Sequence, residues 1–467
     1  MNSLAVQKTS IPGLLLVQLP VHEDARGWFK ENWQKEKMVA AGLPDFRPVQ
    51  NNVSFNKAVG ITRGIHAEPW DKYVSVVGGA VFGAWVDLRE GANFGRVYTH
   101  ELRAGQAMFV PRGVGNGFQT LEANTGYSYL VTEHWSEQAK NHYTFVNLAD
   151  EKLAIDWPID LQQSTISEAD RDHPALAAVV PVKKRKTLVL GANGQVGRAL
   201  AKEVSGNEEF EFLTRNDFNL GNAQDLAELN WAQYETVINA AAFTQVDAAE
   251  TENGRENAWA VNVQAMSELA QQCAKHAITL VHISSDYVFD GRENSYTEDS
   301  PVCPLGVYGQ TKAAGDSVVR VVPRHYIFRT SWVIGDGKNF IATMQQLAAT
   351  GIDPEVVNDQ IGRLSFSGEI ARGILHVLRV GSPFGTYNLT NDGEPLSWAA
   401  LAKETFKILG YSPNRVKEVS TSEYFRDQEL FAARPANSIL DLTKIKDTGF
   451  KPKDHMEELK NYLDPKY

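Results

Sequence analysis

The spacing of apolar residues changes between residues 174 and 186, and this change constrains the fold more than any other feature of the chain. Before it, short apolar runs at residues 73–86, 97–102, 107–111 and 127–132 are separated by glycine, asparagine and proline. Such a pattern is typical of an all-β sandwich, jelly roll or barrel. After it, apolar runs at 187–190, 211–213, 236–239 and 279–284 alternate with helical segments at 195–204 and 263–276. This alternation predicts a parallel sheet with right-handed crossovers.

We therefore expect two domains, residues 1–173 and 187–467, joined by a proline- and lysine-containing linker at residues 174–186. In the first domain, a strand is expected at residues 14–17 and one helix at residues 31–41. Gly78 and Gly79 divide the run at 73–86 into two strands, which predicts a hairpin.

Charge and cysteine content exclude several classes of protein. The chain has 46 Lys+Arg against 57 Asp+Glu, a net charge of −11, so it lacks the basic excess of a nucleic-acid-binding protein. Its two cysteines, Cys273 and Cys303, cannot form a disulfide framework, which fits a reducing cytoplasm. The apolar run at residues 14–17 is far too short to span a bilayer. We expect a cytoplasmic protein with no membrane or nucleic-acid partner.

A glycine-rich turn follows the first strand of the second domain. The segment TLVLGANGQVGRALA places Gly191, Gly194 and Gly197 between a predicted strand and a predicted helix. Glycine there permits a tight turn and close approach of backbone N–H groups to a pyrophosphate at the helix N-terminus. The next strand ends on Arg215, where an acidic residue would hold the ribose of NAD. A guanidinium pairs well with a 2′-phosphate, so NADPH is favoured and NADH remains an alternative.

Tyr308 and Lys312 stand four residues apart, so both lie on one face of a helix. A lysine there can lower the pKa of the phenol, which then donates a proton near neutral pH. Upstream, Ser284 and Ser285 end a predicted strand and offer hydroxyls to a substrate oxygen.

The second domain resembles the dTDP-4-dehydrorhamnose reductases of the extended short-chain dehydrogenase/reductase superfamily. The likeness rests on VINAAAFTQVDAAE, SSDYVFDG, YGQTKAAGD, FRTSWV, VNDQIG and RPANS. It implies a Rossmann fold with a smaller substrate-binding part, in which Tyr308 is the proton donor, Lys312 its partner and Ser285 the third catalytic residue. The implied cofactor-binding residues are Gly191, Asn193, Gly194, Gln195, Val196, Gly197, Arg215, Ala240, Ala241 and Ala242, and the implied substrate contacts are Trp332, Arg434 and Asn437. One departure is Arg363-Leu364-Ser365, where the family commonly has a Pro-Thr pair.

The informative residues of the first domain are individually not decisive: Asp24-Ala-Arg26-Gly27-Trp28-Phe29-Lys-Glu31, Gln50-Asn51-Asn52, Arg63-Gly64-Ile65-His66, Lys72, Tyr129 and Asp170. Together they resemble the dTDP-4-dehydrorhamnose 3,5-epimerases, which are cupin-like jelly rolls. The resemblance implies that His66 is the general base, Asp170 its orienting carboxylate and Tyr129 the acid. The implied substrate-binding residues are Arg26, Glu31, Gln50, Asn52, Arg63, Lys72 and Asn116. Asn116 stands where the family has a titratable histidine, and Lys140 where an acidic contact is common. No ligand set for a metal is evident, and we expect none.

The two resemblances imply consecutive steps: 3,5-epimerisation of dTDP-4-dehydro-6-deoxy-D-glucose, then NAD(P)H-dependent reduction of the C4 ketone to dTDP-L-rhamnose. One alternative keeps the reductase beside a 3-epimerase or non-catalytic first domain. Another is a regulatory protein that binds a sugar nucleotide or NADP without turnover. A homodimer is expected by analogy alone.

Overall fold

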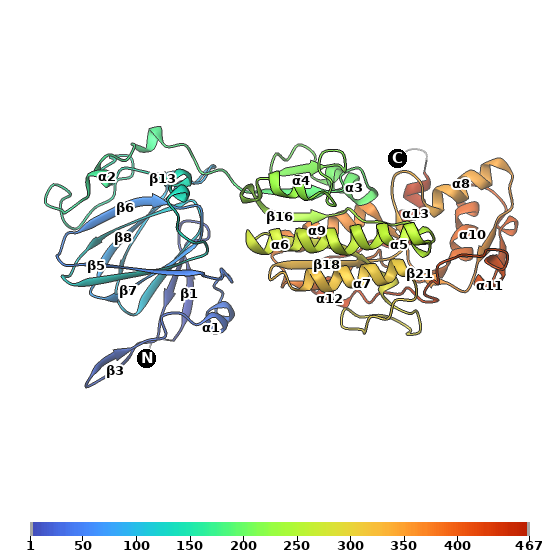
Figure 1. Cartoon of the computed structure of the whole chain (residues 1–467), viewed down its shortest axis with the longest axis horizontal. Coiled ribbons are helices and arrows are strands. Elements are labelled where there is room, and N and C mark those ends of the chain that lie inside the picture. Colours follow the sequence, from blue (N-terminus) through green and yellow to red (C-terminus); the bar gives the residue numbers. More distant parts are fainter. Residues whose placement is uncertain (1–2, 465–467) are drawn as a thin grey trace. The chain divides into compact units, whose positions relative to one another are not determined.

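The computed structural model describes residues 3–464 and separates into two compact units, Met1–Lys184 and Arg185–Tyr467 (Figure 1). Most of the segment expected to be a linker packs on the first unit. Val179 is buried, Val182 forms a β-bridge with Arg89, and the Leu176 N–H donates to Asp150. The second unit begins its first strand at Lys186.

The first unit is the predicted all-β jelly roll, built from two antiparallel sheets (Figure 1). One sheet has the strand order β1 (Ala5–Lys8), β2 (Leu15–Gln18), β10 (Gln106–Val110), β7 (Lys72–Gly78), β12 (Thr125–Val131) and β5 (Gln50–Asn56). The other has the order β13 (Thr144–Phe145), β6 (Thr62–Ala67), β11 (Val114–Thr120), β8 (Val81–Asp87) and β9 (Val97–Leu102). Apolar side chains from both sheets, among them Val74, Trp85 and Phe118, form the core between them.

The hairpin predicted around Gly78-Gly79 is wrong, although both of its strands exist. β7 pairs with β10 and β12 in one sheet, whereas β8 pairs with β11 and β9 in the other. Gly79, at φ 80°, carries the chain from one sheet to the other, and a Cβ there would lie 2.3 Å from the Thr125 hydroxyl. A two-glycine turn can therefore connect strands of two different sheets as readily as it connects the two strands of a hairpin.

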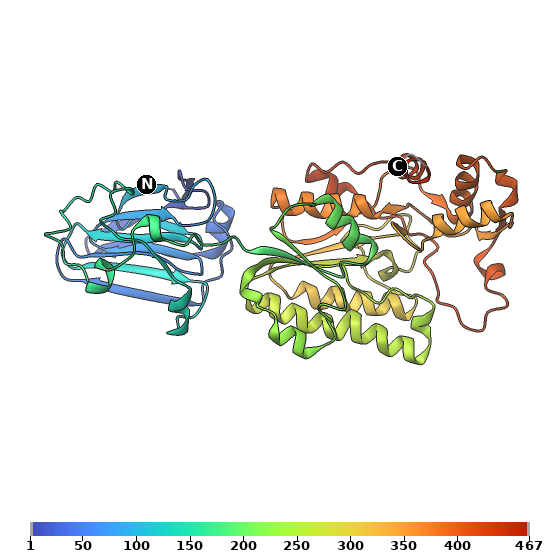
Figure 2. The ribbon, with the colours of Figure 1, turned by 90° about the horizontal axis from the view of Figure 1, so that it is seen from above.

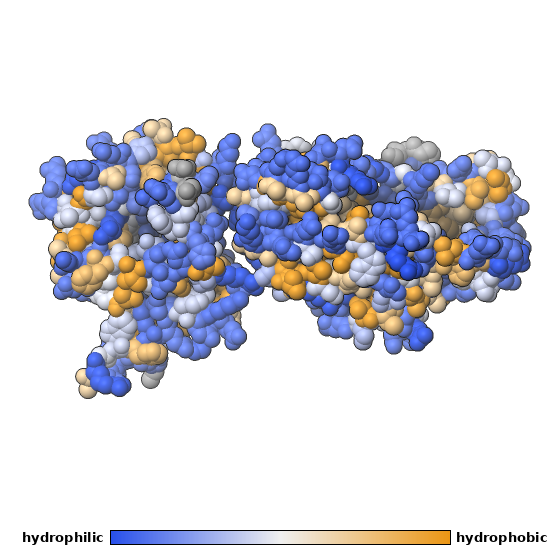
Figure 3. Space-filling model, in the orientation of Figure 1, coloured by the Kyte–Doolittle hydropathy of each residue, from blue (hydrophilic) through white to orange (hydrophobic). Residues whose placement is uncertain are grey.

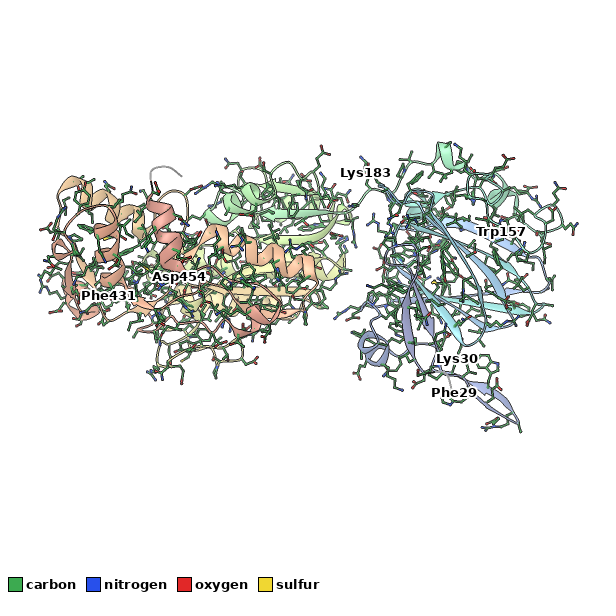
Figure 4. The ribbon with its side chains drawn as sticks, turned by 180° about the vertical axis from the view of Figure 1, so that it is seen from behind. Phe29, Lys30, Trp157, Lys183, Phe431 and Asp454 are labelled. Atoms are coloured by element: carbon green, nitrogen blue, oxygen red, sulfur yellow. The ribbon has the colours of Figure 1, made fainter. Side chains whose placement is uncertain are left out.

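A short hairpin of β3 (His22–Asp24) and β4 (Gly27–Phe29) leaves the sandwich, with Phe29 and Lys30 on the chain that returns from it (Figure 4). Lys30 anchors that return, because its buried ammonium donates to the carbonyls of Val76 and Ala104, each at 2.8 Å. The predicted helix at residues 31–41 is shorter, α1 (Lys35–Ala40), and α2 (Glu168–Arg171) lies near the end of the unit.

The second unit contains the predicted parallel sheet. Its strand order is β15 (Phe210–Leu213), β14 (Lys186–Leu190), β16 (Tyr234–Asn239), β17 (Thr279–Ser285), β18 (His325–Thr330) and β23 (Gly385–Asn388). β14 is the first strand of this unit, and its two neighbours lie on opposite sides. The carboxyl end of β14 is therefore a topological switch point, where ligands bind in sheets of this kind.

Helices cover both faces of this sheet (Figure 2). On one face, α6 (Ala265–Lys275) and α7 (Val307–Arg320) contribute Met266, Leu269 and Val319 to one core. On the other, α3 (Gln195–Glu203), α9 (Ser367–Val380) and α12 (Thr443–Asp447) contribute to a second core. α4 (Ala223–Glu228) and α5 (Glu252–Trp259) complete the helices of the sheet region.

The remaining elements form a smaller region with its own apolar clusters, which include Ile341, Leu401 and Leu459. Its helices are α8 (Phe340–Thr350), α10 (Trp398–Ile408), α11 (Thr421–Tyr424) and α13 (His455–Leu463), the last capped at its start by Asp454 (Figure 4). Short strand pairs join them: β19 (Val333–Ile334) with β22 (Ser365–Phe366), β20 (Glu355–Val357) with β25 (Lys417–Val419), and β21 (Ile361–Gly362) with β24 (Leu396–Ser397).

The face drawn in Figure 3 is mainly hydrophilic over both units, with apolar side chains in separate groups. Among residues 3–464, every helix is too short or too polar to cross a membrane.

Candidate active sites

In the first unit, His66 and Asp170 meet although 104 residues separate them along the chain. His66 lies on β6, and Asp170 lies on α2, whose N-terminus is capped by the Ser167 hydroxyl. The His66 Nε2 and Asp170 Oδ1 atoms are 2.9 Å apart, and the Gly64 N–H donates to Oδ2 at 3.4 Å. An imidazole and a carboxylate are thus held together by two different parts of the fold.

The protonation of this pair follows from the surroundings of Asp170. Burial alone would raise the pKa of its carboxyl, but the hydrogen bond and charge of His66, with the donors from Gly64 and Ser167, outweigh burial and lower it. An ionised carboxylate accepts, so His66 carries its proton on Nε2 and leaves the lone pair on Nδ1. The tautomer is assigned from this network, and it makes Nδ1 the nitrogen that can accept a proton.

Groups from the same sheet and from the facing sheet surround this pair. Asn116 on the neighbouring strand β11 pairs with His66 on β6, and the Tyr127 hydroxyl of the facing sheet donates to the Asn116 side chain at 3.1 Å across the sandwich. Tyr129 lies two residues further along β12, opposite Asn52 on β5. Burial raises the pKa of Tyr129, and the nearby charge of Glu68 raises it further. Tyr129 therefore stays a protonated phenol at neutral pH.

A buried ion pair of Lys72 with Glu68 lies beside these groups. Lys72 was expected from the sequence to contact substrate, whereas Glu68 was not singled out. Lys72 Nζ is 2.7 Å from Glu68 Oε1, with side chains only 5% and 11% exposed. The indole N–H of Trp70 donates to the other Glu68 oxygen at 2.6 Å. Burial, then Glu68, raises the pKa of Tyr143, whose ring packs edge-on against Trp70. The segment HAEPWDK could have indicated this ion pair, because it places the carboxylate of Glu68 four residues before the ammonium of Lys72.

The other expected substrate-binding residues are more dispersed. Gln50 lies beside Asn52 on β5 and donates to its side-chain oxygen at 2.8 Å. Arg63 is exposed on β6 and donates to Asn56. Arg26 is on the projecting β3–β4 hairpin, paired with Asp24, and Glu31 pairs with Lys37 on α1. The structure thus brings His66 together with Asp170 and Asn116, and separately places Tyr129 opposite Asn52, which accepts from Gln50. Arg26 and Glu31 pair with other residues.

The glycine-rich turn of the second unit is closely packed. A Cβ on Gly191, at φ 77°, would lie 2.7 Å from the Ala241 nitrogen, and one on Gly197 would lie 2.3 Å from the Gly191 carbonyl oxygen. Gly194 begins α3 without any side-chain cap, so the first N–H groups of the helix stay available to an anion. Ala240, Ala241 and Ala242 follow β16 directly beside this turn.

Two side chains near the glycine-rich turn bear on cofactor binding, Gln195 and Arg215. The Gln195 side-chain oxygen is buried without a hydrogen-bond partner at the start of α3. Arg215 is exposed in the turn after β15, whereas Asp217 accepts from the Thr214 N–H and hydroxyl and closes that turn. The residues present therefore fit a dinucleotide with an additional phosphate near Arg215.

Tyr308 and Lys312 lie on α7 as expected, but the lysine does not lower the pKa of the phenol. Burial raises the pKa of Tyr308, and the charge of Asp286 raises it further. Lys312 is buried, and its Nζ donates to the Ile283 carbonyl at 2.7 Å and approaches His282 Nε2 at 3.3 Å. Burial lowers the pKa of Lys312 to about 8.

Two acidic groups near this pair were not singled out from the sequence. Asp286 is buried beside Ser285, whose hydroxyl donates to it at 2.9 Å, and burial raises the pKa of Asp286 to about 6. Asp316, one turn after Lys312, is buried against Arg329 at 3.4 Å. In the sequence, Asp286 belongs to SSDYVFDG and Asp316 to YGQTKAAGD, and nothing in either segment distinguishes a buried aspartate from a surface one.

The three residues expected to contact substrate in this unit have defined partners. Trp332 follows β18 and stacks on Trp398 with ring centroids 3.8 Å apart. Arg434 pairs with Asp247 at 2.7 Å, and Asn437 donates to the carbonyls of Glu293 and Asn294. Arg363, where the family commonly has Pro-Thr, is a buried cation that donates to the Leu440 carbonyl.

Comparison with known proteins identifies a family for each half of the chain. The family model described as dTDP-4-dehydrorhamnose 3,5-epimerase matches residues 8–178, and the RmlD substrate binding domain matches residues 185–467. The first half is 53% identical over 180 residues to the protein RmlC homolog of Streptococcus pyogenes serotype M6, covering 38% of this chain and 90% of that protein.

The second half is 38% identical over 304 residues to the dTDP-4-dehydrorhamnose reductase of Aggregatibacter actinomycetemcomitans, covering 59% of this chain and 97% of that protein. A crystal structure of the Bacillus anthracis dTDP-4-dehydrorhamnose reductase in complex with NADP matches with a TM-score of 0.55 and 30% identity, covering 60% of this chain and 98% of that one. The chain therefore belongs to two enzyme families at once, the dTDP-4-dehydrorhamnose 3,5-epimerases through its first unit and the dTDP-4-dehydrorhamnose reductases through its second.

Proposed function

We propose that this chain is a bifunctional enzyme that makes dTDP-L-rhamnose from dTDP-4-dehydro-6-deoxy-D-glucose in two steps. The first unit epimerises C3 and C5, and the second reduces the C4 ketone with NADPH. The observation that carries the proposal is the 2.9 Å contact between His66 and Asp170 within an epimerase fold that is joined to a complete reductase fold.

In the first step, His66 Nδ1 takes the proton from a carbon beside the ketone, and the bonding electrons pass to the C4 oxygen as an enolate. The Asp170 carboxylate stabilises the imidazolium that forms. Tyr129 then gives its proton to the opposite face of the same carbon, which inverts it. The raised pKa of Tyr129 supports this role, because the phenol must hold its proton until the carbanion forms. Asn116, Asn52 and Gln50 supply hydrogen bonds to the sugar nucleotide.

For the second step, the turn from Gly191 to Gly197 would hold the pyrophosphate of NADPH, Ala240–Ala242 would line the cofactor, and Arg215 would hold its 2′-phosphate. The unpartnered Gln195 oxygen, buried at the start of α3, supports a polar ligand there. When bound, NADPH supplies the hydride that reaches C4.

Tyr308 donates the proton that the new C4 oxygen requires, and the Ser285 hydroxyl, which donates to Asp286 in this structure, turns to donate to the same oxygen. Lys312 would bind the nicotinamide ribose of the cofactor. The Arg434 and Trp332 side chains contact the sugar nucleotide. A homodimer and a cytoplasmic location belong to this proposal as well, the latter supported by two free cysteines.

Product identification tests the proposal most directly. The purified chain is incubated with the keto sugar and NADPH in D2O, and the product is analysed by mass spectrometry and NMR. dTDP-L-rhamnose labelled at C3 and C5 is the expected product. Label at C3 alone would indicate a 3-epimerase, unlabelled reduced sugar would indicate a non-catalytic first unit, and no oxidation of NADPH would indicate a binding protein.

A further inference from the structure

A second histidine lies against the His66–Asp170 pair and takes no part in the proposed mechanism. His173 Nε2 is 3.9 Å from Asp170 Oδ1, the same oxygen that His66 approaches. Its ring meets the His66 ring edge-on at 5.1 Å and stacks on Phe145 at 4.7 Å. Both imidazoles therefore have a nitrogen within 4 Å of the same carboxylate oxygen.

The surroundings of His173 are unusual for a structural histidine. Its side chain is only 10% exposed, and its Nδ1 is buried without a hydrogen-bond partner. Histidine binds transition metals through a neutral ring nitrogen.

The spacing of the three donors is close to that of a metal site. One nitrogen from each histidine and one Asp170 oxygen all lie within 4.8 Å of one another. Zinc bonds of about 2.0–2.2 Å in a tetrahedron place neighbouring ligand atoms about 3.3–3.6 Å apart. The His66–Asp170 and His173–Asp170 separations of 2.9 Å and 3.9 Å lie on either side of that range, and the fourth position would be left for water.

We propose that His66, Asp170 and His173 form a reversible inhibitory site for a divalent transition metal of the Zn²⁺ class. The metal would bond to His66 at Nε2, displacing the proton that Asp170 now accepts. That proton then resides on Nδ1, and a metal-bound imidazole with Nδ1–H has no lone pair to accept a substrate proton. The ion therefore stops the epimerase without touching the second unit. This consequence for activity rests on the proposed base role of His66, whereas metal binding itself does not.

The test uses the full chain, first stripped with a chelator. Co²⁺ serves as a spectroscopic probe that is independent of activity, and Zn²⁺ is titrated against solvent-deuterium exchange into the keto sugar. His173→Asn removes one ligand and keeps a small polar side chain at a position outside the catalytic groups. His142→Asn, at an exposed histidine of the same unit, is the matched control. Thermal melts of both variants establish that they are folded.

We expect one Co²⁺ per chain with strong visible absorption, and exchange that Zn²⁺ inhibits and a chelator restores. His173→Asn should weaken both effects by at least about tenfold, the smallest loss typical when even a second-shell partner is removed. His142→Asn should change neither. Absence of Co²⁺ absorption in the parent chain, or full absorption in folded His173→Asn, overturns the site. Co²⁺ binding without inhibition of exchange would leave the site in place and refute the base role of His66 at that nitrogen.

Discussion

The substitution Asp170→Asn replaces one carboxylate oxygen in the epimerase site with an amide NH2 group. The Asp170 carboxylate accepts from His66 at 2.9 Å and from the Gly64 N–H at 3.4 Å through different oxygens, with a further hydrogen bond from the Ser167 side chain. An asparagine has only one oxygen, so its NH2 group must face one of those two donors. If the amide oxygen stays with Gly64, the NH2 group faces His66 and forces the imidazole proton onto Nδ1.

The expected loss follows from the charge-assisted hydrogen bond that this change removes. Such a bond contributes about 1.5–3 kcal/mol, and here it is strongest when His66 becomes an imidazolium. At about 1.4 kcal/mol per tenfold change in rate, deuterium exchange should fall by about 10- to 150-fold. The lower pKa of Asp170 keeps its carboxylate ionised throughout the neutral range, so protonation of Asp170 should not limit exchange there.

The assay is initial-rate incorporation of solvent deuterium into the keto sugar, followed by mass spectrometry. Asp172→Asn is the matched control, because Asp172 is an exposed carboxylate two residues away. NADPH binding to the second unit should be the same in both variants. A folded Asp170→Asn protein that exchanges within about twofold of the parent rate would refute the assigned tautomer and the orienting role of Asp170.

Three further predictions concern the second unit. Tyr308→Phe should lower ketone reduction by at least about 100-fold, since a general acid is lost, while deuterium exchange continues; loss of both activities in a folded protein would contradict independent sites. Because burial lowers the pKa of Lys312 to about 8, its ammonium is present below that pH and lost above it, so kcat/KM for reduction should fall as pH rises through about 8. Lys312→Arg should remove that limb if it remains active, and a parent profile that stays flat to pH 10 would exclude Lys312 as its source. Gly197→Ala should weaken NADPH binding and lower Tm, because its Cβ would lie 2.3 Å from a backbone oxygen and overpacking costs about 1–3 kcal/mol. Gly368→Ala, which has no neighbour within 4 Å, is the control, and equal NADPH affinity in the two variants would contradict the close-packed turn.

Features set by neighbouring residues could be predicted from the sequence. β9 spans the expected residues 97–102, and α3 spans 195–203 against an expected 195–204, because strand and helix periods depend on local spacing. The i,i+4 placement of Tyr308 and Lys312 follows from helix geometry alone. By contrast, β7 and β8 could not be assigned to different sheets, since the same glycine pair suits a hairpin or a crossing.

The sequence did not determine the electrostatic environment of Tyr308 and Lys312. The expectation that Lys312 lowers the pKa of Tyr308 is wrong for this structure, because burial and Asp286 dominate the phenol while Lys312 is held by Ile283 and His282. Burial depends on elements that are distant along the chain, so no local pattern reports it.

By itself, the sequence determined that a β sandwich precedes a parallel α/β unit and that the second unit carries a phosphate-binding turn. Only the tertiary structure decided which side chains meet. Asp170 and His173 come from one short C-terminal segment of the first unit, and folding places both against His66, 104 positions from Asp170. The physical reason is that chain periodicity specifies which face a residue occupies, whereas packing of the whole unit specifies what lies opposite that face.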